Sequence, residues 1–439
     1  MVQREMIAVC QMTSTHDIDE NYKTMKDMIK RAADRNCKMV FFPECCDFIG
    51  RTREESINLA MHEDASFVQR LRADASEHGI WISVGSFHEK MDKECFPHSA
   101  PEKMCMPKNT TLIIDGNGAL VTKYRKLHLF DLEIPGVVRL MESDFSSAGH
   151  GLLKPVETPI GRLGLNICYD VRFPELSLWH RSQGAQVLCY PAAFTVNTGF
   201  AHWETLLRAR AIETQCYVVA PAQTGKHNDK RSSYGHSMVV DPWGAVVAQC
   251  SDNIDMCFAE INLEFLEKIR VMQPVFEHRR RDLYSLQTNY VAPADESDLK
   301  FAQHIINKET IFYRSELSYA FVNHKPVVEG HVLVAPIREV KHLTDLTDQE
   351  TSDLFNVSKR IQAMLQKTYN TESFTVAIQD GSLAGQSVKH VHIHIVPRRE
   401  GDFNGDDIYQ ELAKHDKTDR QPRDHDGMKQ EAELYVKNM

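Results

Sequence analysis

Three histidines alternate with β-branched residues in the segment His390–Val396. This alternation has the period of a β-strand, so we expect the imidazoles on one face and Val391, Ile393 and Ile395 toward the core. Burying three titratable rings together costs desolvation and like-charge repulsion. The pattern therefore indicates chemistry, because a neutral imidazole is a good nucleophile toward phosphorus and titrates near neutral pH.

Two other interpretations of the histidine strand are a surface strand without a function and a metal site. His-x-His can supply two metal ligands from one face of a strand. The preceding segment Gly385–Val388 favours phosphate instead. A glycine-bearing turn exposes backbone N–H groups, which bind phosphate oxygens. No metal site is predicted.

A second candidate site surrounds Cys168, more than two hundred residues upstream. The segment Leu163–Ile167 has the composition of a buried strand, and Arg172–Leu176 begins a helix. A cysteine at a strand-to-helix turn is sterically exposed and lies near helix N–H groups, which favour the thiolate. The alternative is a buried structural thiol, the usual state of a free cysteine.

Two charged residues that follow other apolar segments complete a constellation with Cys168. Glu44 comes directly after Phe41–Pro43, and Lys126 lies within Lys123–Asp131. Either charge alone is more often a solvated strand end. Together with Cys168 they form a constellation of a carboxylate, an ammonium group and a thiol.

The elements that must position these residues follow two patterns. In the first part, apolar runs alternate with helical segments such as Asn21–Ala33 and His202–Thr214, which predicts an α/β layered domain. The expected buried strands are Ile7–Cys10, Met39–Phe42, Ile80–Gly85, Thr111–Asp115, Leu163–Ile167, Val187–Tyr190, Tyr217–Ala220 and Met238–Val240. A polar, proline-containing stretch at 288–297 predicts a linker between domains 1–287 and 298–439.

The second part has the pattern of a small α+β domain, a sheet packed on a helix. A capping box at Thr347–Glu350 begins a helix with an apolar stripe from Leu354 to Leu365. The charged tail after Pro397 is expected to be partly mobile. The expected strands, the first two of them forming a hairpin, are Tyr319–Asn323, His331–Ala335, Phe374–Gln379 and His390–Val396.

Composition excludes several functional classes. The chain has 439 residues, 42% hydrophobic and 26% charged, as in a soluble protein of two or three domains. A net charge of -10 argues against a general nucleic-acid binder. No secretory signal or membrane helix is visible. The eleven cysteines all lie between Cys10 and Cys257 and include no CxxC pair, so we expect reduced thiols and a cytoplasmic location.

The histidine pattern is similar to the signature of the histidine triad (HIT) family, His-φ-His-φ-His-φ-φ. Residues 298–420 resemble its Fhit branch, the dinucleoside polyphosphate hydrolases. Ser387 stands where threonine is usual, and both residues offer a hydroxyl group. The segments that carry the resemblance are Phe301–His304, Phe321–Asn323, Gly330–Val334, Gln379–Gly381 and Asp407–Tyr409.

This resemblance implies that His392 attacks the α-phosphate of diadenosine triphosphate and forms an AMP–histidine intermediate, so that the products are AMP and ADP. His390 would orient His392, and His331 would support the rings without touching the substrate. No cofactor is required, although Mg²⁺ or Mn²⁺ could assist by neutralising substrate phosphates. The implied nucleotide-binding residues are His304, Asn323, Gln379, Gly385, Gln386, Ser387, Val388 and His394.

Glu44, Lys126 and Cys168, in this order and context, resemble the triad of the nitrilase superfamily. Glu142 matches the auxiliary glutamate of that family, and the resemblance covers residues 5–285. It implies a nitrilase-type α-β-β-α sandwich. The segments that resemble the Nit amidase branch are His202–Thr214 and Tyr234–Ser237.

The nitrilase resemblance also implies a mechanism. Glu44 acts as general base, Cys168 attacks the amide carbon to form a thioester, and Lys126 stabilises the oxyanion. Glu142 positions the substrate or the lysine, and no cofactor is needed. The superfamily cleaves nitriles, amides or carbamoyl groups with one triad, and the Nit branch implies a small carboxylate-bearing amide such as deaminated glutathione. The candidates for binding its carboxylate are Arg172 and Arg208.

The whole chain resembles the Nit–Fhit fusion family of invertebrates, which implies a bifunctional hydrolase. Helix 202–214 would pair across subunits and the HIT half would dimerise, so we expect a homotetramer. The basic run 278–281 could serve such an interface or form a solvated turn. The alternative function is a signalling module that acts in its nucleotide-bound state with slow turnover. Small molecules are the expected partners, with no nucleic acid and no membrane.

Overall fold

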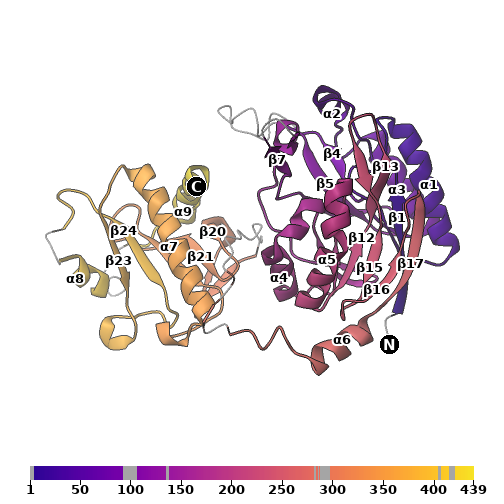
Figure 1. Ribbon diagram of the computed structural model, residues 1–439. Helices are drawn as coiled ribbons and strands as arrows, with labels where there is room; N and C mark the ends of the chain where they lie inside the picture. Colours follow the sequence, from indigo (N-terminus) through magenta and orange to yellow (C-terminus); the bar gives the residue numbers. More distant parts are fainter. Residues whose placement is uncertain are drawn as a thin grey trace. The chain divides into compact units, whose positions relative to one another are not determined.

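The computed structural model divides the chain into two compact units, Met1–Arg279 and Arg280–Met439 (Figure 1). Of the expected linker 288–297, only Ser297 belongs to the residues described. Among the described residues, no helix is both long and apolar enough to cross a membrane. The described residues are 4–91, 106–134, 138–280, 283–284, 286, 297–403, 407–414 and 421–439.

The first unit contains two stacked β-sheets. The strands of the first sheet are β1 (Arg4–Met12), β2 (Met39–Phe41), β3 (Trp81–Ser83), β4 (Phe87–Glu89), β5 (Lys108–Ile114), β6 (Leu120–Arg125), β13 (Ala222–Lys226), β14 (Ser232–Tyr234) and β17 (Asp255–Asn262). Their order is β14-β13-β1-β2-β3-β5-β4, with β17 beside β1 and β6 beside β5. Strands β1, β2 and β3 run parallel, as in a layered α/β domain.

The second sheet has the order β16-β15-β12-β11-β10-β9. Its strands are β9 (Val156–Thr158), β10 (Gly161–Leu165), β11 (Val187–Cys189), β12 (Tyr217–Ala220), β15 (Met238–Val240) and β16 (Val246–Gln249). A separate hairpin is formed by β7 (Asp131–Ile134) and β8 (Val138–Met141). Each strand segment expected in this half of the chain overlaps a strand, whereas β17, which pairs with β1 along almost its whole length, was not expected.

Helices cover both outer faces of the two sheets. They are α1 (Ile18–Asp34), α2 (Arg53–Leu59), α3 (Ser66–His78), α4 (Pro174–Ser182), α5 (Val196–Thr214) and α6 (Leu263–Met272). One core packs Met25 and Leu71, from α1 and α3, against the first sheet. The other core fills the space between the sheets and reaches Trp203 and Leu207 of α5. Helices α1 and α3 thus lie on one side of the sheets and α4 and α5 on the other, which confirms the α-β-β-α sandwich (Figure 1).

The second unit is an α+β domain, as expected. Its strands are β18 (Leu299–Phe301), β19 (His304–Ile306), β20 (Ile311–Arg314), β21 (Ser318–Val322), β22 (Val332–Pro336), β23 (Phe374–Ile378) and β24 (Ile393–Pro397). The main sheet has the order β20-β21-β22-β24-β23, and β18 pairs with β19. Strands β21 and β22 form the expected antiparallel hairpin.

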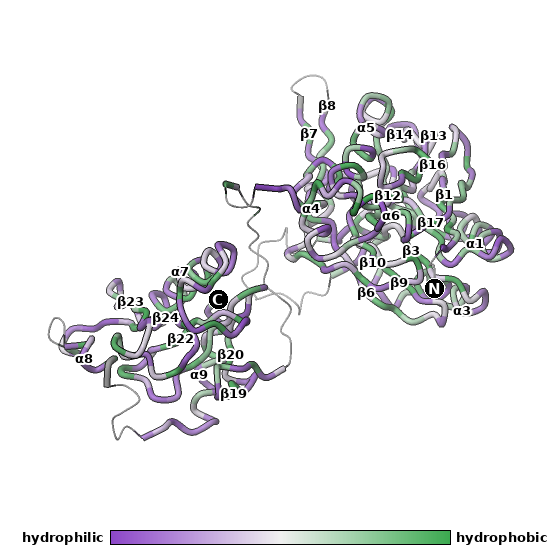
Figure 2. The backbone as a smooth tube through the Cα atoms, turned by 90° about the horizontal axis from the view of Figure 1, so that it is seen from below, coloured by the Kyte–Doolittle hydropathy of each residue, from purple (hydrophilic) through white to green (hydrophobic). Residues whose placement is uncertain are grey.

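Three helices belong to the second unit: α7 (Asp348–Tyr369), α8 (Asp407–Lys414) and α9 (His425–Asn438). Thr347 and Glu350 form the expected capping box at the start of α7. The predicted apolar stripe of α7, which includes Leu354 and Leu365, packs on the sheet. Hydrophilic and hydrophobic stretches alternate along α1 and α7, as they do in surface helices with one buried side (Figure 2).

One expectation for this unit is wrong. Strand β24 begins only at Ile393, because the backbone N–H groups of His390 and Val391 donate to the carbonyls of Val388 and Val340, which lie outside the neighbouring strands. The tail after Pro397, which was expected to be partly mobile, contains helix α9. Helix α9 inserts Ala432 and Tyr435 into the main core, so this part of the tail is folded.

Candidate functional sites

The first candidate site is built at the ends of strands β2, β6, β8 and β10. Glu44 follows β2, Lys126 directly follows β6, Glu142 directly follows β8, and Cys168 follows β10. Strands β2 and β6 belong to the first sheet, β10 to the second sheet and β8 to the hairpin, so the site lies where strand ends of three sheets come together. The four residues expected from the sequence therefore meet in one place.

Lys126 is the centre of this site. Its side chain is 2% exposed, and Nζ lies 2.8 Å from Glu44 Oε1 and 2.8 Å from Glu142 Oε2. Burial alone would lower the pKa of Lys126, but the charges of Glu142 and Glu44 raise that pKa well above its usual value. Lys126 is therefore a fixed ammonium group shared by two carboxylates.

Glu44 is held in its charged form. Burial opposes ionisation, but the charge of Lys126 and its hydrogen bond lower the pKa of Glu44 below its usual value. Glu44 also forms a side-chain hydrogen bond with Cys168. The carboxylate is thus in position to accept the thiol proton.

Cys168 differs from the expectation in two respects. It begins a short 3-10 helix, Cys168–Arg172, with φ of 46°, but it is only 8% exposed rather than open to solvent. Burial first, and then the charge of Glu44, raise the pKa of the thiol well above its usual value, although Lys126 lowers it in part. The expectation that helix N–H groups favour a thiolate is therefore wrong for the resting site, and activation requires a base.

Asn109 is a residue of this site that the sequence did not indicate. Its Nδ2 donates to Glu44 Oε1 at 2.9 Å and to Glu142 Oε1 at 3.2 Å. Asn109 lies in β5, and its carbonyl accepts a hydrogen bond from the backbone N–H of Lys126. A single asparagine within a strand carries no motif, so only the pairing of β5 with β6 could have revealed it.

A buried carboxylate ties the cysteine segment to the lysine segment. Asp170 accepts hydrogen bonds from Ile167 N at 2.8 Å, His128 N at 3.1 Å and Tyr124 Oη at 2.8 Å. Since Asp170 is fully buried, these bonds are shielded from competing water. The loop of the nucleophile is therefore fixed to the segment of Lys126.

The two arginines considered for carboxylate binding have different surroundings. The Arg172 guanidinium lies 5.9 Å from the ring centroid of Tyr169 and 5.5 Å from that of Phe194, beside the cysteine segment. Arg208 instead donates to the Gly244 carbonyl at 2.8 Å and pairs with Glu204. Arg172 is thus the candidate whose contacts lie next to the nucleophile.

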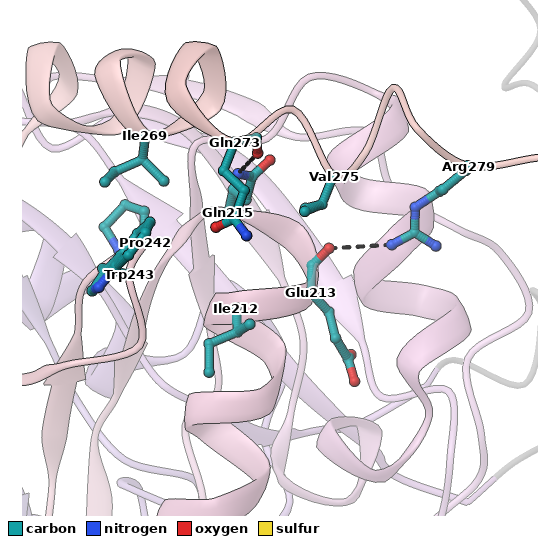
Figure 3. Close-up of a pocket in the computed structure, with 9 residues that line it drawn as sticks. All are labelled: Ile212, Glu213, Gln215, Pro242, Trp243, Ile269, Gln273, Val275 and Arg279. Carbon is teal, nitrogen blue, oxygen red and sulfur yellow. Dashed lines mark hydrogen bonds between the residues drawn. The ribbon is translucent and has the colours of Figure 1, made fainter.

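A pocket of about 350 Å³ lies elsewhere in the first unit, between the end of α5, the turn at Pro242–Trp243 and α6 (Figure 3). Two hydrogen bonds join residues of its lining. Gln215 Nε2 donates to the Gln273 carbonyl at 2.6 Å, and Arg279 Nη2 donates to the Glu213 carbonyl at 3.2 Å. The residues described around this pocket include no predicted site residue, so it plays no part in the chemistry considered above.

The second candidate site is a row of histidines in the C-terminal unit. His390, His392 and His394 are all at most 5% exposed. The Phe301 ring lies 5.4 Å from the His390 ring and 5.0 Å from the His392 ring, and the rings of His392 and His394 are 4.8 Å apart. Phe301 comes from β18, so the β18–β19 hairpin contributes a ring to the site.

Backbone contacts fix the proton positions of these rings. His392 Nδ1 lies 2.7 Å from the His390 carbonyl. A carbonyl only accepts hydrogen bonds, so Nδ1 must carry the proton, and the lone pair of neutral His392 is therefore on Nε2. The N–H of Val327 donates to His331 Nδ1, and His331 Nε2 then donates to His394 Nδ1 at 3.0 Å. This places the proton of neutral His394 on Nε2, where it can be donated outward.

The glycine-bearing turn forms more hydrogen bonds with the protein itself than expected. Gly385 has φ of 93°, a conformation that favours glycine. The side chain of Gln386 accepts from Gly381 N at 3.1 Å and donates to the Lys341 carbonyl at 2.9 Å, so its amide holds the turn together. Ser387 is exposed, and Val388 packs beside Phe301.

The remaining predicted nucleotide-binding residues surround this row. Asn323 is 3% exposed, and its Nδ2 lies 3.4 Å from His331 Nδ1. His304 is exposed on β19, and Gln379 directly follows β23. The described residues contain no group of three or more histidine, cysteine or acidic side chains arranged to hold a metal ion.

Comparison with known proteins gives matches over the whole chain. The family description "Carbon-nitrogen hydrolase" matches residues 6–271, and "HIT domain" matches residues 306–401. The nitrilase and fragile histidine triad fusion protein of Caenorhabditis elegans is 59% identical over 98% of this chain and 96% of its own length. Its crystal structure superposes with a TM-score of 0.87 at 56% identity, covering 100% of both chains. The deaminated glutathione amidase of Bos taurus is 48% identical over 64% of this chain and 83% of its own length.

The fold, the two groups of side chains and these matches define a carbon–nitrogen hydrolase of the Nit type joined to a Fhit-type HIT domain. The chain belongs to the family of nitrilase and fragile histidine triad fusion proteins.

Proposed function

We propose that the first unit is an amidase in which Cys168 is the nucleophile, Glu44 the general base and Lys126 the oxyanion donor. The observation that carries this proposal is a buried ammonium group shared by Glu44 and Glu142, with Glu44 hydrogen-bonded to Cys168. Because the thiol is protonated at rest, Glu44 takes its proton as sulfur attacks the amide carbon. Lys126 then stabilises the oxygen that becomes negative.

The reaction continues through a thioester. Collapse of the tetrahedral intermediate expels the amine of the substrate, which takes the proton from Glu44. Glu44 next removes a proton from water, the water attacks the thioester, and the acid product leaves. Glu142 and Asn109 keep the ammonium group and the base in place throughout. This cycle uses no metal or organic cofactor.

We propose a small, carboxylate-bearing amide as the substrate, specifically deaminated glutathione. The identity of 48% with the deaminated glutathione amidase of Bos taurus supports this choice. Arg172 supplies a cation beside the cysteine segment that could bind the substrate carboxylate.

The test is hydrolysis of deaminated glutathione by wild type and by Cys168→Ala, with the released amine followed by mass spectrometry. We expect turnover by wild type, loss of at least about 10³-fold in the variant, and an acyl adduct on intact protein only when Cys168 is present. Full activity in Cys168→Ala would contradict the assignment of Cys168 as the nucleophile. Absence of turnover in both would exclude this substrate.

We propose that the second unit cleaves diadenosine triphosphate to AMP and ADP through His392. The tautomer set by the His390 carbonyl supports this role, because it leaves the nucleophilic lone pair of His392 on Nε2. Nε2 attacks the α-phosphorus and ADP leaves, and water then releases AMP from the histidine. His394 donates from Nε2 to a phosphate oxygen, and His390 and His331 orient the rings.

Substitution of the proposed nucleophile tests this second activity. His392→Ala should keep the fold and lose turnover of diadenosine triphosphate, as measured by chromatographic separation of AMP and ADP. Trapped AMP–protein in wild type, located on the peptide of His392, would support the intermediate. Wild-type rates in His392→Ala would rule out the assignment.

We further propose that a divalent cation such as Mg²⁺ acts only by neutralising the phosphates of the nucleotide substrate. A homotetramer in the cytoplasm is the proposed state of the protein. Analytical ultracentrifugation tests the oligomeric state. A dependence of the amidase reaction on added Mg²⁺ would contradict the proposed role of the cation.

A further inference from the structure

The three donors of the Lys126 ammonium group are all in use in the resting site. Nζ lies 2.8 Å from Glu44 Oε1, 2.8 Å from Glu142 Oε2 and 3.0 Å from Glu142 Oε1. An ammonium group carries three N–H donors, so each donor already has an acceptor. Lys126 can therefore hydrogen-bond to the negative oxygen of a tetrahedral intermediate only if it gives up one of these contacts.

Glu142 Oε1 is the acceptor that Lys126 can leave most easily. Its distance from Nζ is the longest of the three, and it is also reached by Asn109 Nδ2 at 3.2 Å. Glu142 Oε2 accepts from the backbone N–H of Phe130 at 2.8 Å in addition to Lys126. When Nζ turns away from Oε1, the Glu142 carboxylate is thus still held through Oε2, and Oε1 still has a donor in Asn109.

Asn109 also serves the second carboxylate. Its Nδ2 lies 2.9 Å from Glu44 Oε1, so the two N–H groups of one amide reach the two oxygens that share Lys126 Nζ. These two oxygens and two nitrogens form a closed ring of hydrogen bonds. The backbone keeps the ring in register, because the Asn109 carbonyl accepts from Lys126 N at 2.9 Å. Asn109 is therefore a neutral second donor at each Oε1.

The amide oxygen of Asn109 shows that this orientation has a cost. Asn109 is 6% exposed, and its buried Oδ1 has no hydrogen-bond partner among the residues that the structure describes. An unsatisfied buried acceptor is unfavourable. The opposite orientation would place Oδ1 against two carboxylate oxygens, so the charges of Glu44 and Glu142 direct the N–H groups toward themselves. An unsatisfied group of this kind calls for a functional reason.

We propose that Asn109 is a positioning residue that allows Lys126 to change hydrogen-bond partners during the reaction. As sulfur attacks and the substrate oxygen becomes negative, Lys126 turns one N–H from Glu142 Oε1 to that oxygen. Asn109 stays on Glu142 Oε1, so this oxygen keeps a donor. The exchange moves no proton from one atom to another, and it reverses when the intermediate collapses. This role rests on the proposed function, because it requires an oxyanion formed by attack of Cys168.

Steady-state kinetics of amide hydrolysis test this role. Asn109→Leu replaces the amide by an apolar side chain of similar size and removes both N–H donors. Because the exchange occurs only in the transition state, kcat and kcat/KM should both fall at least about tenfold, with little change in KM. Asn109→Ser keeps one hydroxyl donor and should lose less; it replaces Asn109→Leu should that variant not fold. An unchanged kcat in these variants would overturn the proposal.

Alkylation of Cys168 by iodoacetamide separates this role from damage to the base or to the fold. Displacement of iodide forms no oxyanion, so it needs the nucleophile and Glu44 but not the exchange at Lys126. Trypsin releases peptide 163–172, in which Cys168 is the single cysteine. The alkylation rates of wild type and Asn109→Leu should agree within about twofold. Equal losses of alkylation and hydrolysis would contradict the exchange at Lys126.

Butyraldehyde tests the exchange without a substrate. An S–C bond forms, the carbonyl oxygen becomes negative and Glu44 takes the thiol proton, as in the tetrahedral intermediate. The aldehyde should protect Cys168 from iodoacetamide, and half-protection should need a concentration at least about tenfold higher in Asn109→Leu than in wild type. Equal protection in both proteins would refute the role of Asn109. If wild type is protected but hydrolyses no amide, the proposed function fails, and the protection measurement still decides this role.

Discussion

At the scale of single residues, the amidase site depends on Lys126. The buried carboxylate of Glu44 and the partly buried carboxylate of Glu142 share its charge, and Asn109 gives each of them a further hydrogen bond. A lone buried carboxylate is strongly unfavourable, so removing the ammonium group should cost far more than removing a surface lysine. The arrangement also explains how Glu44 stays ionised in a buried place.

The substitution Lys126→Met tests whether the site depends on this ammonium group. We expect the first unit to lose about 3 to 5 kcal/mol of unfolding free energy at pH 7, the typical cost of breaking a buried pair. All four tryptophans lie in this unit, so their fluorescence during urea unfolding reports it alone. Lys30→Met, at a side chain that is 66% exposed, should change stability by no more than about 0.5 kcal/mol.

The unfolding free energy lost in Lys126→Met should depend on pH, with a smaller loss at lower pH. In wild type the pKa of Glu44 is lowered, so its contribution to stability is present above the unfolded pKa and falls as pH drops through the folded value. In Lys126→Met burial raises that pKa, and the carboxyl is protonated more readily. The destabilisation should therefore be smaller at pH 5 than at pH 7. A constant difference across this range would contradict the charge argument.

The sequence indicated the residues that carry a local pattern and missed those that act through pairing. His392 and Cys168 were found because their neighbours form motifs. Asn109 was missed, because its role depends on β5 lying beside β6. The raised pKa of the Cys168 thiol was also missed, since it results from burial beside Glu44 and not from the helix that follows.

At the scale of elements, both folds follow from short apolar runs that end in reactive residues. The buried strands were predictable because central strands are continuous apolar segments. Strand β17 alternates buried and exposed residues less regularly, and it is fixed by pairing with β1 more than two hundred residues away. Helix α9 was missed because few of its residues are buried, among them Ala432 and Tyr435, within a charged tail.

Tyr435 should nevertheless be essential for the HIT unit. Its ring is fully buried in the main core, and its hydroxyl lies 2.7 Å from that of Tyr369. Tyr435→Ala should destabilise this unit by about 3 to 5 kcal/mol, the usual cost of truncating a buried aromatic ring. Hydrogen exchange of α7 and β21, measured by mass spectrometry, should rise accordingly.

A matched control is available on helix α8. Tyr409 is 54% exposed, and Tyr409→Ala should leave the exchange of α7 unchanged. Equal protection in wild type and Tyr435→Ala would show that α9 does not support the core.

At the scale of the whole molecule, the chain consists of two units with separate cores and separate sets of proposed catalytic residues. Neither set includes a residue of the other unit. The full-length match to the fusion protein of Caenorhabditis elegans shows that the combination is a property of the family and not a feature of this chain alone. The two chemistries should therefore be separable by single substitutions.

The most direct test of the account measures both reactions in three proteins: wild type, Cys168→Ala and His392→Ala. Each protein is given deaminated glutathione and, separately, diadenosine triphosphate. We predict that Cys168→Ala loses only amide hydrolysis and His392→Ala loses only nucleotide hydrolysis, each by at least about 10³-fold. Turnover of either substrate by the variant that lacks its proposed nucleophile would contradict the account.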